Sequence, residues 1–293
     1  MGLSMNLSLK QPSPIGFLLI AILSIQFGSA LAKSLFSELG PWGVVSLRVT
    51  FSALSLFIIW RPKLHEQARQ HYKLILAYGI VMAMMNSAFY ASINRIPLGI
   101  AIALEFTGPL GLSILKSQRW LDLLWAALAI LGVVLLTPLS GSTLNLTGMV
   151  LALIAGVCWA FYILLAARLG PALPGVEGLT WGLFVSTLIL LPVGIIHAGS
   201  ALLNPKLLVL GAGVALLSTA LPYACEIAAL RSLPVKVFGI LLSVEPMMGV
   251  LAGFLILGET LSARSIIACL LVSIAAAGAA RHKDIQQTPE PPV

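Results

Sequence analysis

Two proline-bounded apolar segments, each carrying one glutamate, constrain the fold of this chain more than any other feature. In the first half, Pro97 and Pro109 are 12 residues apart and enclose Glu105. Shifting the sequence by 137 residues superimposes these prolines on Pro234 and Pro246, which are again 12 residues apart. We therefore expect the chain to contain two copies of one structural unit, with the functional site between them.

Both segments belong to a chain that is too apolar for a soluble protein. Hydrophobic residues make up 59% of the 293 positions and charged residues 9%, and the mean hydropathy is +1.03. Because soluble globular chains contain about 25% charged residues, the composition indicates an integral membrane protein. In this class, a net charge of +7 indicates positive cytoplasmic loops rather than nucleic-acid binding.

A transmembrane helix needs about 20 largely apolar residues. By that measure we expect an all-α protein with ten transmembrane helices, at residues 15–36, 41–60, 73–94, 97–115, 121–139, 146–168, 178–197, 206–230, 234–256 and 262–280. The first five-helix repeat then covers residues 12–139, the second covers 146–280, and 281–293 form a disordered cytoplasmic tail. The first helix resembles a secretory signal, but we expect it to be retained, because Ser24 and Gln26 interrupt its apolar run.

The basic residues predict how these helices cross the membrane. Twelve of them fall on the side of the N-terminus and four on the opposite side, and residues 61–73 form the most basic loop. This bias places both termini in the cytoplasm. Because five helices are an odd number, the second copy must enter from the opposite side, which gives an inverted-topology repeat with its site near the midplane.

Glu105 and Glu245 are expected to lie deep in the membrane. Glu105 is eight residues beyond Pro97, about 12 Å along a helix, and Glu245 is 11 residues beyond Pro234, about 16 Å. In a hydrocarbon core about 30 Å thick, an ionised side chain costs at least about 2.5–3.5 kcal/mol. A partner, a water-filled cavity or protonation must offset that cost, so we expect both to be functional; the alternative is that their hydrogen bonds hold helices together.

Pro109 and Pro246 are expected to break their helices and to act as flexible points. Proline has no N–H, so the carbonyl four residues earlier, that of Glu105 or Leu242, loses its helical partner. Unpaired carbonyls are tolerated at this depth where they are buried in protein or line a cavity. A carboxylate beside such a carbonyl would accept an ammonium group or a proton.

Arg48, within the second expected helix, is the natural counter-charge to these glutamates. It could pair with one of them, or bind a substrate carboxylate through its planar fork. Glu226, at the inner end of the eighth helix, has two open interpretations, a structural ion pair with the nearby Arg231 or a functional role. Lys33, near the end of the first helix, is expected to reach the outer surface.

Polar and aromatic side chains deep enough to line a cavity complete the candidate set. We expect lining roles for Asn86, Tyr90, Trp159 and Tyr223. The alternative for the aromatic residues is that they anchor helices at the membrane interface.

Motifs of other function classes are absent from the sequence. There is no G-x-x-x-x-G-K-[ST] nucleotide loop and no H-E-x-x-H metal motif, and no histidine falls in a deep span. We therefore expect no enzyme activity, no catalytic residues, no metal and no cofactor. An intramembrane enzyme acting on lipid lacks a nucleophile–base pair here, and a passive channel remains an alternative.

The motifs resemble those of the EamA-type branch of the drug/metabolite transporter superfamily. The matching stretches include ALEFTGPL at 103–110, LSTALPY at 217–223, Glu226, Glu245-Pro246 and LGETL at 257–261. The resemblance extends over nearly the whole chain, and its first motif is quite specific. It implies a ten-helix, inverted-repeat exporter of small amino acids in the bacterial inner membrane, driven by the proton gradient.

The residues and the resemblance together lead to one expected function. We expect a secondary active exporter of threonine- or homoserine-like amino acids that works by alternating access. In it, Glu105 or Glu245 receives the ammonium group or the coupling proton, and Arg48 receives the carboxylate. The alternative is a broad-specificity drug, metabolite or aromatic amino-acid exporter of the same superfamily. The expected partners are a small amino acid, protons and the lipid bilayer, without nucleic acid, and we expect a monomer.

Overall fold

The computed structural model describes residues 13–62, 66–115, 120–136, 145–173, 176–230, 233 and 235–280. Within these ranges the chain is helical apart from turns, and no strand occurs. Eight helical segments are long and apolar enough to cross a membrane, and two shorter apolar helices span Leu98–Leu112 and Leu123–Leu136. The protein is therefore an all-α membrane protein. The described residues do not include the expected tail at 281–293, nor Arg231 and Pro234.

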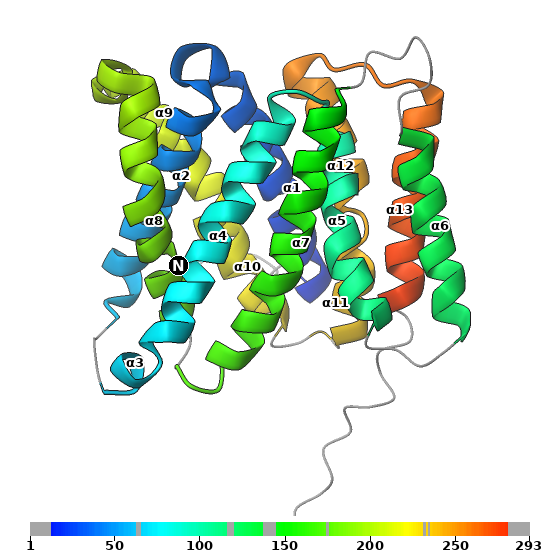
Figure 1. The fold of residues 1–293 in the computed structure, drawn as a ribbon, viewed down its shortest axis with the longest axis horizontal. Helices are drawn as coiled ribbons and strands as arrows, with labels where there is room; N and C mark the ends of the chain where they lie inside the picture. The colour runs from blue at the N-terminus through cyan, green and yellow to red at the C-terminus, as the bar shows by residue number, and fades with distance from the viewer. Residues whose placement is uncertain are drawn as a thin grey trace, which may run out of the picture.

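Six helices form the first half of the bundle (Figure 1). They are α1 Pro14–Ser34, α2 Phe36–Trp60, the short α3 Glu66–Gln70, α4 Tyr72–Ile93, α5 Leu98–Leu115 and α6 Trp120–Leu136.

The second half contains two interrupted helices. Its elements are α7 Leu146–Leu169, α8 Glu177–Ala198, a 3-10 turn at Gly199–Leu203, α9 Pro205–Ala215, a π-helical turn at Leu216–Ala220, α10 Leu221–Leu230, α11 Val235–Leu242, α12 Glu245–Leu257 and α13 Ala263–Ala280. We refer to Leu216–Ala220 as the π-turn.

The helix boundaries follow local signals that the sequence carries. Gly40 has a φ of +64°, which kinks the start of α2 directly before Pro41. Arg61 ends α2 in a left-handed conformation with a φ of +44°. Asn204 caps α9, since its side-chain oxygen accepts the amide of Lys206 at 3.0 Å.

The two prolines expected to break their helices behave differently. Helix α5 runs without interruption past Pro109, so the expected break there is wrong. One missing hydrogen bond does not end a helix that neighbouring helices support. Pro246 instead stands in the first turn of α12, after a turn at Ser243 and Val244 that separates α12 from α11. A proline fits this position, because the first amides of a helix have no partner inside it.

The main helix interfaces join one half of the chain to the other. Helix α2 packs on α8, α4 on α7 and α8, α5 on α7 and α12, and α6 on α13, while α1 contacts α10 and α12. Figure 1 shows α5 beside α12 and α6 beside α13, although these helices are far apart in the sequence. A space enclosed by the bundle is therefore bounded by side chains of both halves.

Candidate functional site

A cavity of about 570 Å³ lies between the two halves of the bundle. Residues of α1, α2, α4, α5, α7, α8, the π-turn and α10 to α13 line it. Its lining reaches Leu112 near the end of α5 and Ala280 at the end of α13, so it extends toward the lower end of the bundle in Figure 1. Toward the other end, Leu98, Ile100 and Ala101 are fully buried.

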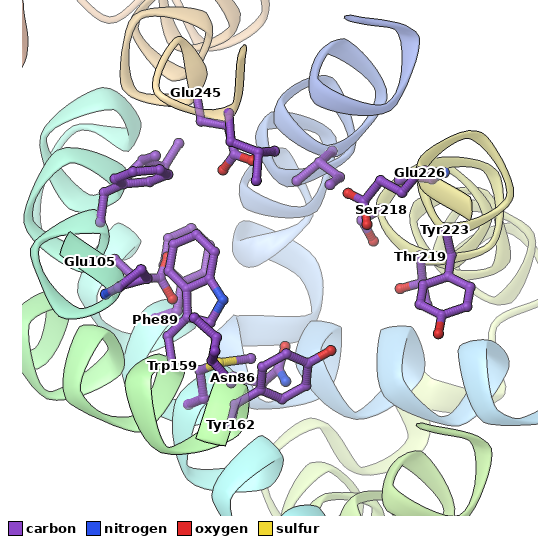
Figure 2. Close-up of a pocket in the computed structure, with 18 of the residues that line it drawn as sticks. Asn86, Phe89, Glu105, Trp159, Tyr162, Ser218, Thr219, Tyr223, Glu226 and Glu245 are labelled. Carbon is purple, nitrogen blue, oxygen red and sulfur yellow. The ribbon is translucent and has the colours of Figure 1, made fainter. Parts of the chain in front are cut away.

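Three carboxylates from three helices line this cavity. Glu105 comes from α5, Glu226 from α10 and Glu245 from α12, and Figure 2 shows them on three sides of the space. Glu245 is 7% exposed. The structure thus brings together the two glutamates that the sequence singled out and the third that it left open.

Glu245 owes its position to the interruption before α12. It is the first residue of that helix, where the unpaired amides and the helix dipole favour a negative charge. The sequence predicted a freed carbonyl at Leu242 as its neighbour, and it did not predict that Glu245 begins a helix.

Glu105 lies beside a close backbone contact between α5 and α7. A Cβ atom at Gly156 of α7 would lie 2.5 Å from the carbonyl oxygen of Glu105. A Cβ atom at Gly108 would overlap the carbonyl of Gly156. The backbones of α5 and α7 therefore touch beside Glu105, and two glycines make that approach possible.

Arg48 of α2 lines the same cavity and is held by neutral groups. Its Nε donates to the Ser218 side-chain oxygen at 2.8 Å, and its Nη1 donates to the Asn86 side-chain oxygen at 2.8 Å. Its Nη2 donates to the Ser218 carbonyl at 3.4 Å. Among the described residues, no carboxylate lies within ion-pairing distance of this guanidinium. The expected pairing of Arg48 with a glutamate is therefore not seen.

Three of the four expected lining residues line the cavity. They are Asn86, Trp159 and Tyr223, all labelled in Figure 2. Tyr90 is fully buried and is not among the lining residues. The guanidinium carbon of Arg48 lies 5.5 Å from the centre of its ring, so Tyr90 packs against Arg48 rather than facing the space.

The sequence suggested that Lys33 reaches the outer surface. In the structure its side chain is 19% exposed and is held by two acceptors. Its Nζ donates to Glu259 Oε1 at 2.5 Å and to the carbonyl of Ile96 at 2.9 Å. These contacts lie at the end of the bundle away from the cavity, beside the buried start of α5.

Several site residues were not found from the sequence. Ser218, Thr219, Phe89 and Phe106 also line the cavity. One usable signal existed for Ser218, since Pro222 follows it by four residues and must disturb the helix there. The aromatic residues carry no comparable signal, because most of the apolar helices contain at least one.

The fold and this cavity define a polytopic membrane protein with an internal cavity lined by charged side chains. A model for the EamA-like transporter family matches residues 146–281. The threonine/homoserine exporter RhtA of Salmonella typhimurium (strain LT2) is 44% identical over 267 residues, covering 90% of each chain. The protein of that name from Escherichia coli (strain K12) is 43% identical over the same length and coverage.

The fold is also similar to that of a solved protein. One crystal structure matches with a TM-score of 0.59 and 18% sequence identity, over 90% of this chain and 96% of the other. The chain belongs to the EamA-like transporter family. Its relatives are transporters, which agrees with the expectation that the protein is not an enzyme.

Proposed function

We propose that the protein is a secondary exporter of threonine- and homoserine-like amino acids, driven by proton antiport. The observation that carries this proposal is the meeting of one guanidinium and three carboxylates around a single cavity. An amino acid is a zwitterion, and both of its charged ends need a partner when water is excluded. The names of the relatives support the same class of substrate.

Each charged group has a proposed role. Arg48 binds the substrate carboxylate, because no carboxylate of the described part of the chain forms an ion pair with it. Glu105 or Glu245 receives the ammonium group, and the other carries the coupling proton. Glu226, which lines the same cavity, is a third candidate for the proton.

The architecture proposed for this transporter is ten spans in two inverted five-helix repeats. We count α9–α10 and α11–α12 as one span each and include the shorter helices α5 and α6. The packing supports the repeat. Helices that take the same place in the two halves are equivalent, and an interface of one helix has a counterpart between the equivalent helices. Helices α2 and α8, α5 and α12, and α6 and α13 are equivalent pairs that contact each other. The α4–α7 interface corresponds to α10–α1, and the α5–α7 interface to α12–α1.

Alternating access would follow from rocking of these two units. The cavity extends toward one end of the bundle, and the Lys33–Glu259 pair lies at the other end. The turn at Ser243 and Val244 offers a flexible point beside Glu245. We further propose that the protein lies in the bacterial inner membrane with both termini in the cytoplasm. The proposed working unit is a monomer.

One observation favours a second candidate function. A volume of about 570 Å³ is in the range of pockets that hold drug-sized ligands. Trp159, Tyr162 and Phe106 line it. Export of aromatic amino acids or amphipathic drugs is therefore the alternative, and a resistance screen on overexpression would distinguish it.

Transport into inside-out membrane vesicles tests the proposal. Vesicles of this orientation convert export into accumulation, so threonine and homoserine should accumulate when a proton gradient is present. A protonophore should abolish that accumulation, and vesicles without the protein give the background. If neither amino acid accumulates, the proposed substrate class is wrong.

A further inference from the structure

The π-turn between α9 and α10 leaves two backbone carbonyls without the partner that an α-helix gives them, the amide four residues further on. The amide of Leu221 bonds to the carbonyl of Leu216, five residues back, which bypasses the carbonyl of Leu217. Pro222 has no amide proton, so it cannot serve the carbonyl of Ser218, four residues back. Turns of this kind occur frequently at functional sites, and this one borders the cavity.

Side chains of the first half of the chain fill both vacant positions. Ser24 of α1 donates its hydroxyl to the Leu217 carbonyl at 2.5 Å. Arg48 of α2 donates Nη2 to the Ser218 carbonyl at 3.4 Å and Nε to the Ser218 side-chain oxygen at 2.8 Å. Two neighbouring carbonyls of one turn thus bind two different helices.

The Ser218 hydroxyl is oriented to accept from Arg48. It donates its own proton to the carbonyl of Val214 at 2.6 Å, so its lone pairs are what it offers to the guanidinium. Ser218 is 6% exposed, and α1 packs against the π-turn. A Cβ atom at Gly28 would lie 3.0 Å from the Ser218 amide nitrogen. The acceptor is therefore fixed in place.

The hydrogen bonds of Arg48 leave a terminal fork unused. A guanidinium has five N–H donors, and the hydrogen bonds to Ser218 and Asn86 use one on Nε, one on Nη1 and one on Nη2. One N–H remains on each terminal nitrogen, and a carboxylate can accept from both terminal nitrogens of a guanidinium in a bidentate contact. Because Ser218 and Asn86 are neutral, they orient the guanidinium without cancelling its charge.

We propose that Ser218 is a positioning residue, which holds the Arg48 fork toward the substrate's α-carboxylate and makes the π-turn part of substrate recognition. This inference rests on the proposed function, because it needs a substrate with a carboxylate. A substrate bound to Arg48 is then linked through Ser218 to the second half of the chain. Binding of the substrate carboxylate by Arg48 in the first half therefore depends on the π-turn in the second half.

A matched pair of serine variants tests the inference. Ser218→Ala removes the side-chain oxygen that accepts from Arg48 Nε, whereas Ser24→Ala removes a hydrogen bond to the same π-turn without removing a partner of Arg48. Threonine uptake into inside-out vesicles should show KM raised about tenfold in Ser218→Ala with kcat within about twofold, since a hydrogen bond to a charged group is lost. Ser24→Ala should raise KM much less than Ser218→Ala does, because Arg48 keeps both of its contacts to Ser218.

Ser218→Cys provides a second variant of nearly the same size with a weak acceptor. It should raise KM as Ser218→Ala does, and threonine binding to purified protein should weaken by a similar factor. This variant keeps the test decisive if Ser218→Ala folds poorly.

The outcomes separate this inference from the proposed function. Equal effects of Ser218→Ala and Ser24→Ala on KM, or unchanged affinity in both Ser218 variants, would show that Ser218 only stabilises the turn, and would overturn the inference while threonine transport stands. A wild-type protein that neither binds nor accumulates threonine overturns the proposed function and the inference with it.

Discussion

The Lys33 ammonium and the Glu259 carboxylate lie 2.5 Å apart and join the end of α1 to the turn between α12 and α13. Glu259 Oε2 also accepts the amide of Leu98 at 2.8 Å, and Lys33 also donates to the carbonyl of Ile96. Gly253 leaves room for this carboxylate, because a Cβ atom there would lie 2.5 Å from Glu259 Oε2. Segments of both halves therefore meet at one ion pair, at the end of the bundle away from the cavity.

Removing Glu259 should cost more stability than removing Lys33. Glu259→Ala loses the ion pair and also leaves the Leu98 amide, one of the first amides of α5, without an acceptor. Lys33→Ala loses the ion pair and a contact to a carbonyl. The double variant should show a coupling of about 1–3 kcal/mol relative to the sum of the single variants. Thermal unfolding in detergent measures all three.

Glu38→Gln is the control for this cycle, because Glu38 is an exposed carboxylate near the same end of the bundle. It should leave the unfolding midpoint unchanged. Additive effects of Lys33→Ala and Glu259→Ala would show that the pair contributes no stability as a unit.

Gln variants of the three cavity glutamates should differ in how they affect the coupling of threonine transport to proton movement. A Gln variant at the residue that carries the proton should lose gradient-driven accumulation but keep threonine counterflow, because exchange of substrate needs no net proton movement. A Gln variant at the residue that binds the ammonium group should lose both. Glu105→Gln, Glu245→Gln and Glu226→Gln are compared in vesicles by the two assays. Wild-type accumulation by both Glu105→Gln and Glu245→Gln would contradict their assigned roles.

Gly108→Ala should disrupt the α5–α7 contact beside Glu105. The added Cβ atom would overlap the carbonyl of Gly156, so the helices must separate, at a cost of about 1–3 kcal/mol or more. Gly111→Ala on the same helix has open space around its Cβ position. It should be neutral, or should stabilise by up to about 1 kcal/mol through helix propensity. The midpoint of thermal unfolding in detergent distinguishes the two variants, and equal midpoints would argue against the close contact.

The membrane class and the approximate positions of the helices could be predicted because they depend on local hydrophobicity. The helix ends at Arg61 and Asn204 coincide with turn signals in the sequence. The depth of Glu105 and Glu245 could be estimated from their distances to the neighbouring prolines, and both line the cavity.

The partners of the charged groups could not be predicted in the same way, because they depend on which helices pack together. Pairing with a glutamate was one of two roles expected for Arg48, but its acceptors come from Asn86 and from Ser218, 170 positions away. Lys33 is likewise joined to a residue 226 positions away. Tyr90 shares a helix with Asn86, yet packs behind Arg48 rather than facing the cavity. Sequence spacing gives the face and depth of a side chain but not its neighbour across the bundle.

Arg48→Lys should fail to replace the arginine, although it keeps the positive charge. The guanidinium donates to Ser218 and Asn86 at once and keeps one N–H on each terminal nitrogen for a carboxylate. A lysine ammonium is a point charge with three donors and no planar fork, so it cannot make this set of contacts. Losing the bidentate contact should lower kcat/KM for threonine about 100-fold or more, at about 1.5–3 kcal/mol for each hydrogen bond. The same change at the exposed Arg69, Arg69→Lys, should leave transport unchanged. Arg48→Lys with wild-type kcat/KM would show that charge alone suffices, and the substrate carboxylate would then need no fork.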